Sequence, residues 1–161
     1  MQPIIDYFQN LAETYKAIGH SDSNCRFAGS YEEFMLLSKS KLKIKEFCIG
    51  IEFEVSEWVN RNEAETELIP IYLNVFKCGK IEDFALNYTI MTEAKAHLIK
   101  LYSKIMKDRR EQATGVAKFL DVSNKKFQYI ALSKGDLFVG AQLELNLKLP
   151  INYSYDPADW N

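Results

Sequence analysis

The fold of this chain is decided by residues Ile81–Arg110, which read IEDFALNYTIMTEAKAHLIKLYSKIMKDRR. Apolar residues recur in this stretch at steps of three and four, at Phe84, Tyr88, Met91, Ala94, Leu98, Leu101 and Ile105. That spacing predicts a single α-helix of about 28 residues, roughly 42 Å long, with one apolar stripe. Glu82 and Asp83 are expected in the first turn and Lys107, Arg109 and Arg110 in the last. Acidic residues at the start and basic residues at the end of a helix interact favourably with its dipole. We expect this helix to lie across a sheet and to supply much of the core.

The composition is that of an ordinary globular chain with one domain. Its 161 residues are 47% hydrophobic and 26% charged, with a net charge of −2. A dedicated nucleic-acid binder normally carries a clear cationic excess, so this class is disfavoured. No apolar run approaches the ~20 residues of a membrane span, and the N-terminus lacks the basic and apolar regions of a signal peptide. Three widely spaced cysteines, Cys25, Cys48 and Cys78, predict no disulfide framework and fit a reducing cytoplasm.

Two segments before the long helix have the period of strands. Residues 45–55 alternate strictly, which predicts a strand with one buried and one wet face. The two sets are Phe47, Ile49, Ile51, Phe53 and Val55, and Glu46, Cys48, Gly50, Glu52 and Glu54. Residues 57–67 are interpreted as an acidic loop. A second strand is predicted over 71–78, with Pro70 just before it, where a missing backbone donor is tolerated.

The N-terminal part is predicted to hold two helices and a short strand. Residues 3–18 carry an apolar stripe at helical spacing, with Pro3 at the first position and a glycine after the last. Residues 25–28 are compatible with a short strand. Ser30 and Glu33 form a capping box, which predicts a helix that runs to about residue 40.

The C-terminal part is predicted to form a hairpin. Residues 112–115 are polar and expected to be mobile, and residues 119–124 are expected to be a loop or an irregular strand. Strands over 127–132 and 137–149 are joined by a turn. The second strand alternates over about 13 residues, whereas strands usually have ~5–6. We expect it to project beyond its domain and to offer a free edge to a neighbour.

The sequence as a whole predicts an α+β fold. We expect an antiparallel sheet of about four to five strands, with the long helix and two shorter helices packed on one face. The predicted domain covers residues 1–150. Residues 151–161 follow as an aromatic arm, and its large side chains are Tyr153, Tyr155 and Trp160.

The residues that carry chemistry form no catalytic constellation. His20 stands in a loop rich in serine and aspartate, and His97 lies beside the apolar stripe of the long helix, so structural roles are favoured for both. The cysteines lack the CxxC spacing of a zinc site, and the glycines form no phosphate-binding motif. We therefore predict no catalytic, cofactor-binding or metal-binding residue, and no cofactor.

An acidic region is the clearest electrostatic feature. Glu52 and Glu54 lie about 7 Å apart on one predicted strand face, a spacing that acid–base chemistry or a divalent metal could use. However, residues 44–70 hold seven acidic and two basic residues, which favours a solvated face that repels nucleic acid. The basic end of the long helix is interpreted in the same way, as a solvated helix end rather than a phosphate site.

The order of elements resembles a known class of structural proteins. The polar His-Ser loop is followed by Arg26-Phe27-Ala28 and by the capped segment Tyr31-Glu32-Glu33. Two strands then flank a charged segment, the long helix ends in Lys-Asp-Arg-Arg, and the final strand reads Phe138-Val139-Gly140-Ala141-Gln142-Leu143-Glu144-Leu145. This layout resembles the tail-terminator, tail-completion and neck-ring proteins of tailed phages and prophages.

The resemblance implies a non-enzymatic virion protein made in the host cytoplasm. Its copies would form a ring, commonly a hexamer, at the tail-to-neck junction, in contact with tail-tube and connector proteins. DNA would pass through the ring without sequence-specific binding, and no membrane would be involved. On this hypothesis, the residues expected to face the lumen or a subunit interface are Glu52, Glu54, Glu144, Trp58, Lys107, Arg109, Arg110, Tyr153, Tyr155 and Trp160.

Two alternatives to this hypothesis are open. The first is a small cytoplasmic enzyme or ligand-binding domain, with a pocket between the long helix and the sheet that uses His20 or Glu52. The second is a cytoplasmic adaptor that binds another protein by strand addition.

Overall fold

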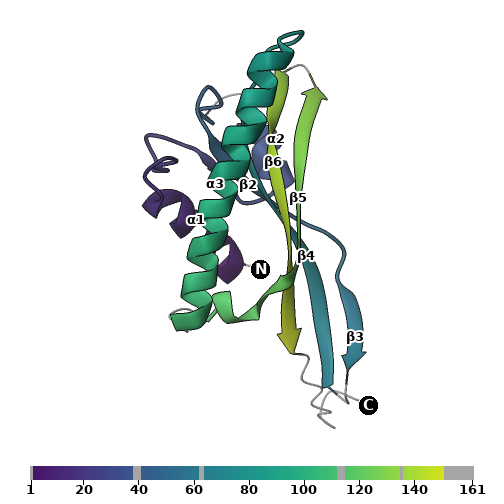
Figure 1. The fold of residues 1–161 in the computed structure, drawn as a ribbon. Helices are drawn as coiled ribbons and strands as arrows, with labels where there is room; N and C mark the ends of the chain where they lie inside the picture. The colour runs from purple at the N-terminus through teal and green to yellow at the C-terminus, as the bar shows by residue number, and fades with distance from the viewer. Residues whose placement is uncertain (1, 38–40, 62–63, 112–114, 135, 151–161) are drawn as a thin grey trace, which may run out of the picture.

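A computed structural model of the chain describes residues 2–37, 41–61, 64–111, 115–134 and 136–150 (Figure 1). Their helices are α1 (Gln2–Thr14), α2 (Tyr31–Leu37), α3 (Phe84–Glu111) and the 3-10 helix η1 (Ala117–Phe119). Their strands are β1 (Phe27–Ala28), β2 (Cys48–Phe53), β3 (Glu57–Arg61), β4 (Ala64–Cys78), β5 (Leu120–Lys134) and β6 (Asp136–Pro150).

The strands form one sheet in the order β1-β2-β4-β6-β5, and β3 pairs with β4 on the edge that β2 also uses. The predicted α+β class is confirmed, although the described sheet has six strands and its β1–β2 pair is parallel. Helices α1 and α3 pack on one face. Helix α2, which we expected beside them, covers part of the opposite face (Figure 1).

The long predicted helix is confirmed as α3, which begins at Phe84 rather than Ile81. Asp83 caps it, because its Oδ1 accepts the Leu86 N–H at 3.0 Å and its carbonyl accepts the Asn87 N–H at 3.0 Å. Glu82 and Asp83 therefore precede the first turn instead of lying in it. The basic last turn is as predicted.

The predicted apolar stripe of α3 is right in its C-terminal two-thirds and wrong at its start. Ala94, Leu98, Leu101 and Ile105 are buried, but Phe84 and Tyr88 are 82% and 65% exposed. Ile90 continues the buried stripe instead, because it stands one turn before Ala94. The first turns of α3 therefore leave large apolar side chains on the surface.

The wet face that we predicted for residues 45–55 is wrong at the first half of β2. Cys48 and Gly50 are buried, since a second small core lies under α2. This core consists of Leu42, Cys48, Phe76 and Phe138, with Phe34 and Leu37 of α2 packed against it. Burial raises the pKa of the Cys48 thiol to about 12, which suits a small apolar side chain rather than a nucleophile. Val55, expected inside, lies beyond the strand and is 87% exposed.

The predicted acidic loop over 57–67 is wrong, because it forms β3 and the start of β4, paired in antiparallel register. Pro70 lies within β4, not before it. Its carbonyl accepts the Glu54 N–H at 3.1 Å, so its missing N–H would point to the same edge of β4. That edge has a gap there, since β2 pairs with residues 71–76 and β3 with residues 64–68. The proline therefore removes no ladder hydrogen bond.

The predicted C-terminal hairpin is confirmed as β5 and β6. Residues 119–124 are largely strand, with a register shift between Asp121 and Lys126. β6 is long, as predicted, but it lies between β4 and β5, so the expected free edge is wrong along most of its length. The predicted mobile segment falls mostly on residues 112–114, and the arm on residues 151–161, which lie outside the described residues.

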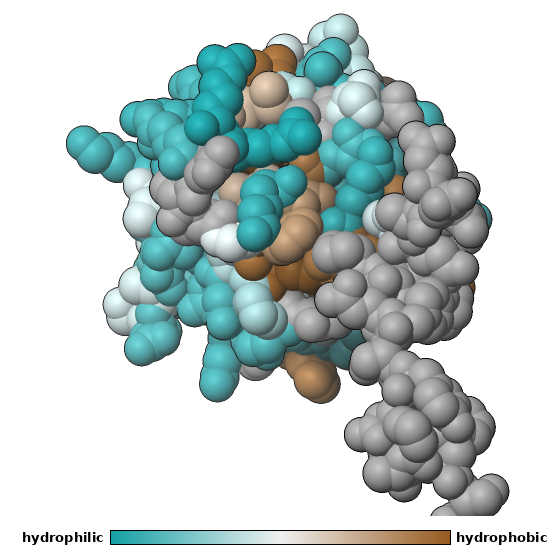
Figure 2. All heavy atoms as spheres, turned by 90° about the horizontal axis from the view of Figure 1, so that it is seen from below, coloured by the Kyte–Doolittle hydropathy of each residue, from teal (hydrophilic) through white to brown (hydrophobic). Residues whose placement is uncertain are grey.

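The molecule is elongated along its strands. Helix α3 begins at the end where β5 finishes, whereas β3 and the adjoining part of β4 extend past the other end of α3 (Figure 1). Seen from that projecting end, the described surface is mostly hydrophilic around a small hollow of apolar atoms (Figure 2). The two ends of the molecule therefore differ in chemistry.

Candidate functional site

The open part of the sheet face opposite α1 and α3 is the strongest candidate site, and we call it the polar face. It results from the strict alternation of β2, β4, β5 and β6, whose other face fills the main core. Its side chains belong to Glu52, Tyr72, Asn74, Lys126, Gln128, Gln142 and Glu144. Four strands from three separate parts of the sequence thus contribute to one surface.

An amide row crosses the polar face. Asn74 donates its side-chain N–H to Glu52 Oε1 at 3.3 Å and accepts a hydrogen bond from the Gln142 amide at 2.9 Å. Gln128 in turn donates to Gln142. Asn74 is 4% exposed. Each amide nitrogen of the row thus donates one hydrogen bond to its neighbour, which orients the amide groups across the sheet.

A charged row lies beside the amide row. Glu52, Tyr72, Glu144 and Lys126 are cross-strand partners in that order. Lys126 Nζ lies 3.2 Å from Glu144 Oε2. Burial, and next the charge of Glu54, raises the pKa of Glu52. Burial, and next a hydrogen bond with Glu54, raises the pKa of Tyr72. With Glu52 and Glu144 against Lys126, the charged row has more carboxylates than cations.

The ion pair of Lys148 with Asp121 continues the polar face toward the projecting end. Lys148 Nζ lies 2.6 Å from Asp121 Oδ2, and the side chain of Ser123 donates to Asp121 Oδ1 at 2.6 Å. Burial raises the pKa of Asp121, but the hydrogen bonds from Lys148 and Ser123 outweigh it and hold this pKa at about 2. The Asp121 carboxyl is thus ionised at neutral pH.

The expected site residues fall into three groups. Glu52 and Glu144 lie on the polar face, and Glu54 is hydrogen-bonded to Tyr72 of this face. Lys107, Arg109 and Arg110 are exposed on α3, on the other side of the sheet, so one copy of the chain does not bring them to the acidic residues. Trp58 lies in β3, but its side chain, like those of Tyr153, Tyr155 and Trp160, is outside the described part of the chain.

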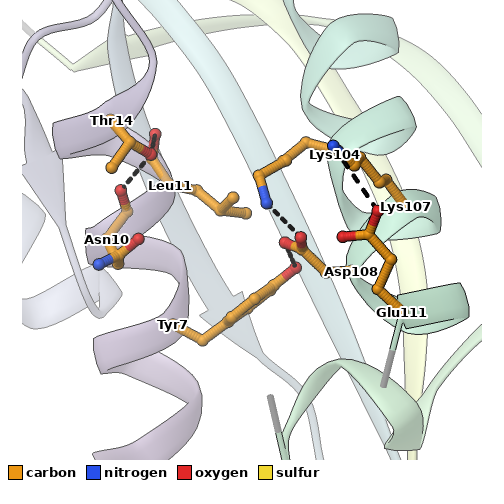
Figure 3. A network of polar contacts seen from close by, with 8 residues as sticks. All are labelled: Tyr7, Asn10, Leu11, Thr14, Lys104, Lys107, Asp108 and Glu111. Carbon is orange, nitrogen blue, oxygen red and sulfur yellow. Dashed lines mark hydrogen bonds and ion pairs between the residues drawn. The ribbon is translucent and has the colours of Figure 1, made fainter. Parts of the chain in front are cut away.

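The basic end of α3 is partly neutralised within the helix. Lys104 pairs with Asp108, whose other oxygen accepts a hydrogen bond from the Tyr7 hydroxyl of α1 at 3.1 Å (Figure 3). Lys107 Nζ lies 3.7 Å from Glu111 Oε1, and both side chains are exposed. The first pair joins two helices, whereas the second is a surface pair.

The histidines occupy packed or bonded positions. The Tyr15 hydroxyl lies 2.7 Å from His97 Nδ1, and the Phe47 ring packs edge-on against the imidazole. Burial, and next the charge of Lys100, lowers the pKa of His97. His20 Nδ1 accepts the Arg26 N–H at 3.1 Å. Within the described ranges, no three His, Cys, Asp or Glu side chains gather as metal ligands would.

The pocket postulated in the enzyme alternative is not lined by the residues expected to use it. Buried apolar side chains fill most of the space between α3 and the sheet, and the groove between the start of α3 and strands β5 and β6 contains neither His20 nor Glu52. His20 lines a polar hollow beside α1 and α2, and Glu52 lies on the opposite face of the sheet. The two residues therefore do not share a site.

The sequence alone did not identify five residues of the polar face, namely Asn74, Gln142, Gln128, Tyr72 and Lys126. Their positions on outward strand faces were visible in the alternation, but the register that lines them up across strands was not.

Among the described residues, no helix is both long and apolar enough to cross a membrane. No family model matches the chain, and no curated protein matches it.

The raised pKa of Glu52 gives a testable pH dependence. Folding disfavours the ionised carboxyl, so its contribution to stability is complete below its unfolded pKa of ~4.3 and is lost as the pH rises through the folded pKa. Glu52→Gln removes this loss and keeps an acceptor for Asn74. We expect its unfolding temperature to exceed that of the wild type by about 1–2 °C at pH 7.

The comparison is made by differential scanning fluorimetry at several pH values, and the difference should vanish near pH 4. Glu46→Gln, at an exposed glutamate just before β2, is the control and should change little at either pH. An equal effect of Glu52→Gln at pH 4 and pH 7 would contradict the assignment of this effect to ionisation.

Proposed function

We propose that this protein is a structural virion protein of a tailed phage. Its copies form a ring of six at the tail-to-neck junction, as a tail terminator or connector component, and DNA passes through the lumen. The polar face lines the passage or a subunit boundary and performs no chemistry. Tail-tube and connector proteins contact the two rims.

The polar face is the observation that carries this proposal. A wall along which DNA slides must be wet and must not attract phosphate. The amide row is polar and its groups are oriented toward one another, and the charged row has an excess of carboxylates. Like charge then keeps the duplex from adhering.

Charge placement supports contacts between copies. The acidic polar face and the basic end of α3 lie on opposite sides of the sheet. They are too far around the molecule to pair within one chain, but they are well placed to meet between neighbours. A contact that uses different surfaces on its two sides is heterologous and closes into a ring when the rotation permits.

The proposal is tested first by assembly. Mass photometry and negative-stain microscopy of the purified chain should show a ring, and mass spectrometry of particles released from the source strain should detect the chain. A species that is monomeric at every concentration and absent from particles would contradict the proposal. Both measurements are needed because some ring proteins assemble only on their partners.

The polar face is tested by charge reversal. The double variant Glu52→Lys/Glu144→Lys should bind duplex DNA in a salt-dependent manner, measured by fluorescence anisotropy, whereas the wild type should not. A matched change of net charge on the other side, Asp6→Lys/Glu13→Lys at two exposed acidic residues of α1, is the control and should bind more weakly. Equal binding by the two variants would show that position on the polar face does not matter.

A further inference from the structure

An apolar groove lies at the end of the molecule where α3 begins, and we call it the apical groove. It runs between the start of α3 and the β5–β6 hairpin. Its main apolar lining consists of Ile81, Phe84, Tyr88, Met91, Leu137 and Val139. Ile81 is 67% exposed, in addition to the highly exposed Phe84 and Tyr88. Three large apolar side chains on one patch of a soluble domain indicate an interaction surface.

The backbone around the apical groove is fixed before any partner arrives. The Asn87 side chain accepts the Lys80 N–H at 3.0 Å and donates to the Lys80 carbonyl at 2.8 Å. A Cβ at Gly79 would lie 2.5 Å from Val139 Cγ2, so the turn passes the hairpin as closely as a glycine allows. The exposed apolar side chains thus stand on a preorganised turn, which lowers the entropic cost of binding.

Residues 151–161 supply an occupant of matching chemistry. They contain Ile151, Tyr153, Tyr155 and Trp160, together with two aspartates and no basic residue. Charges of both signs lie at the apical groove, since Glu82 lines it and Lys80 just precedes Ile81, so the match is one of apolar surface. Aromatic side chains that enter the groove would bury apolar surface on both partners.

The first aromatic residues of this segment cannot reach the apical groove of their own chain. Residue 151 follows the end of β6, whereas Leu137 and Val139, at the start of β6, line the apical groove. The start and the end of β6 lie far apart along the molecule (Figure 1). Leu137 and Val139 precede Pro150 by thirteen and eleven residues of strand, roughly 36–43 Å. Tyr153 and Tyr155 can reach no farther than roughly 10–18 Å from Pro150. They therefore cannot enter the groove of their own chain.

We propose that the apical groove of one copy binds residues 151–161 of a second copy. The donor segment follows the end of β6 and the acceptor groove lies at the start of β6, so the contact uses two different surfaces, is heterologous and can repeat from copy to copy. The inference rests on the proposed ring, for which it supplies a subunit contact.

Two complementary variants test this contact. Phe84→Ser/Tyr88→Ser disables the groove, and Tyr153→Ser/Tyr155→Ser/Trp160→Ser disables the donor segment, each in the full chain. By sedimentation or mass photometry, the wild type should form oligomers and each variant alone should be monomeric. A mixture of the two variants should form dimers, because one intact segment meets one intact groove and the chain of contacts then stops.

Matched controls separate binding from folding. Leu86→Ser alters an exposed apolar side chain on the same turn of α3 that does not line the groove, and it should assemble like the wild type. Unfolding temperatures of all variants should stay close to that of the wild type, since the altered groove side chains are already exposed.

Each contrary result has its own meaning. A donor-segment variant that still assembles, or a mixture that stays monomeric, overturns this contact. Dimers of the donor-segment variant that are lost with Phe84→Ser/Tyr88→Ser would show that two grooves meet each other instead. A monomeric wild-type chain also overturns the contact, whereas the ring proposal is then decided separately by the composition of the particles.

Discussion

Gly140→Ala is expected to lower the free energy of unfolding by about 3 kcal/mol or more, although it adds only one methyl group. Gly140 is the fifth of the fifteen residues of β6 and lies opposite Phe76 of β4. A Cβ at this position would lie 2.0 Å from the Val75 carbonyl oxygen and 2.7 Å from Phe76 Cα. Both are backbone atoms, so relief requires the central strands to move apart. Overpacking against a side chain typically costs ~1–3 kcal/mol, and a backbone obstacle cannot rotate away.

The expected loss is large against a typical stability of about 5–15 kcal/mol, and it should lower the unfolding temperature by about 6–12 °C. Calorimetry or chemical denaturation measures it. Gly115→Ala is the control, because a Cβ there meets nothing within 4 Å, and it should change stability by at most about 0.5 kcal/mol. Gly50→Ala should be intermediate, since its nearest obstacle is the edge of the Phe76 ring at 3.2 Å. Similar unfolding temperatures for the alanine variants at 140 and 115 would contradict the argument.

The same contacts explain what the sequence could and could not reveal about the sheet. The period of β6 and of the C-terminal part of α3 is local and strong, so both elements were predictable. The second core was not, because it needs Phe76 beside Gly140 and over Gly50, and these residues meet only through the strand register. A signal was present, however. Phe76 and Phe138 occupy outward positions, and a large apolar side chain on a supposedly wet face points to a second layer.

The hairpin of β3 and β4 shows a different limit. Residues 57–67 have no apolar alternation, since acidic and polar side chains dominate, and their strand form depends on pairing across the turn. Cross-strand pairing is a non-local property, so composition alone suggested a loop. Pro70 reinforced that error, because the gap between β2 and β3 that tolerates it is visible only in the sheet.

The candidate site was predictable in part for the same reason. Glu52 and Glu144 could be assigned to outward strand faces from alternation alone. Their common row, with Tyr72 and Lys126 between and beside them, depends on how β2, β4, β6 and β5 align. The proposed function was less accessible still, because a surface proposed to act by repulsion and by contact between copies carries no catalytic motif.

The second large effect is expected at the link between α1 and α3, where Lys104→Gln should cost about 2 kcal/mol. Asp108 is 5% exposed, and its two partners are Lys104 and the Tyr7 hydroxyl (Figure 3). Loss of the ammonium leaves a buried carboxylate with one neutral hydrogen bond. Breaking a fully buried pair costs ~3–5 kcal/mol, but the Lys104 side chain is half exposed, so water already weakens this pair.

Lys107→Gln is the matched control, because the same residue type lies one turn away in the same helix and also pairs at i,i+4. Both members of the Lys107–Glu111 pair are exposed, so its loss should cost no more than about 0.5 kcal/mol. A double-mutant cycle with Asp108→Asn isolates the coupling, which we expect to exceed about 1 kcal/mol, whereas the cycle of Lys107→Gln with Glu111→Gln should give about 0.5 kcal/mol or less. Equal coupling energies in the two cycles would mean that burial of Asp108 adds nothing to the pair. The stability of α1 on α3 would then depend on the apolar contacts around Phe8 and Leu11 alone.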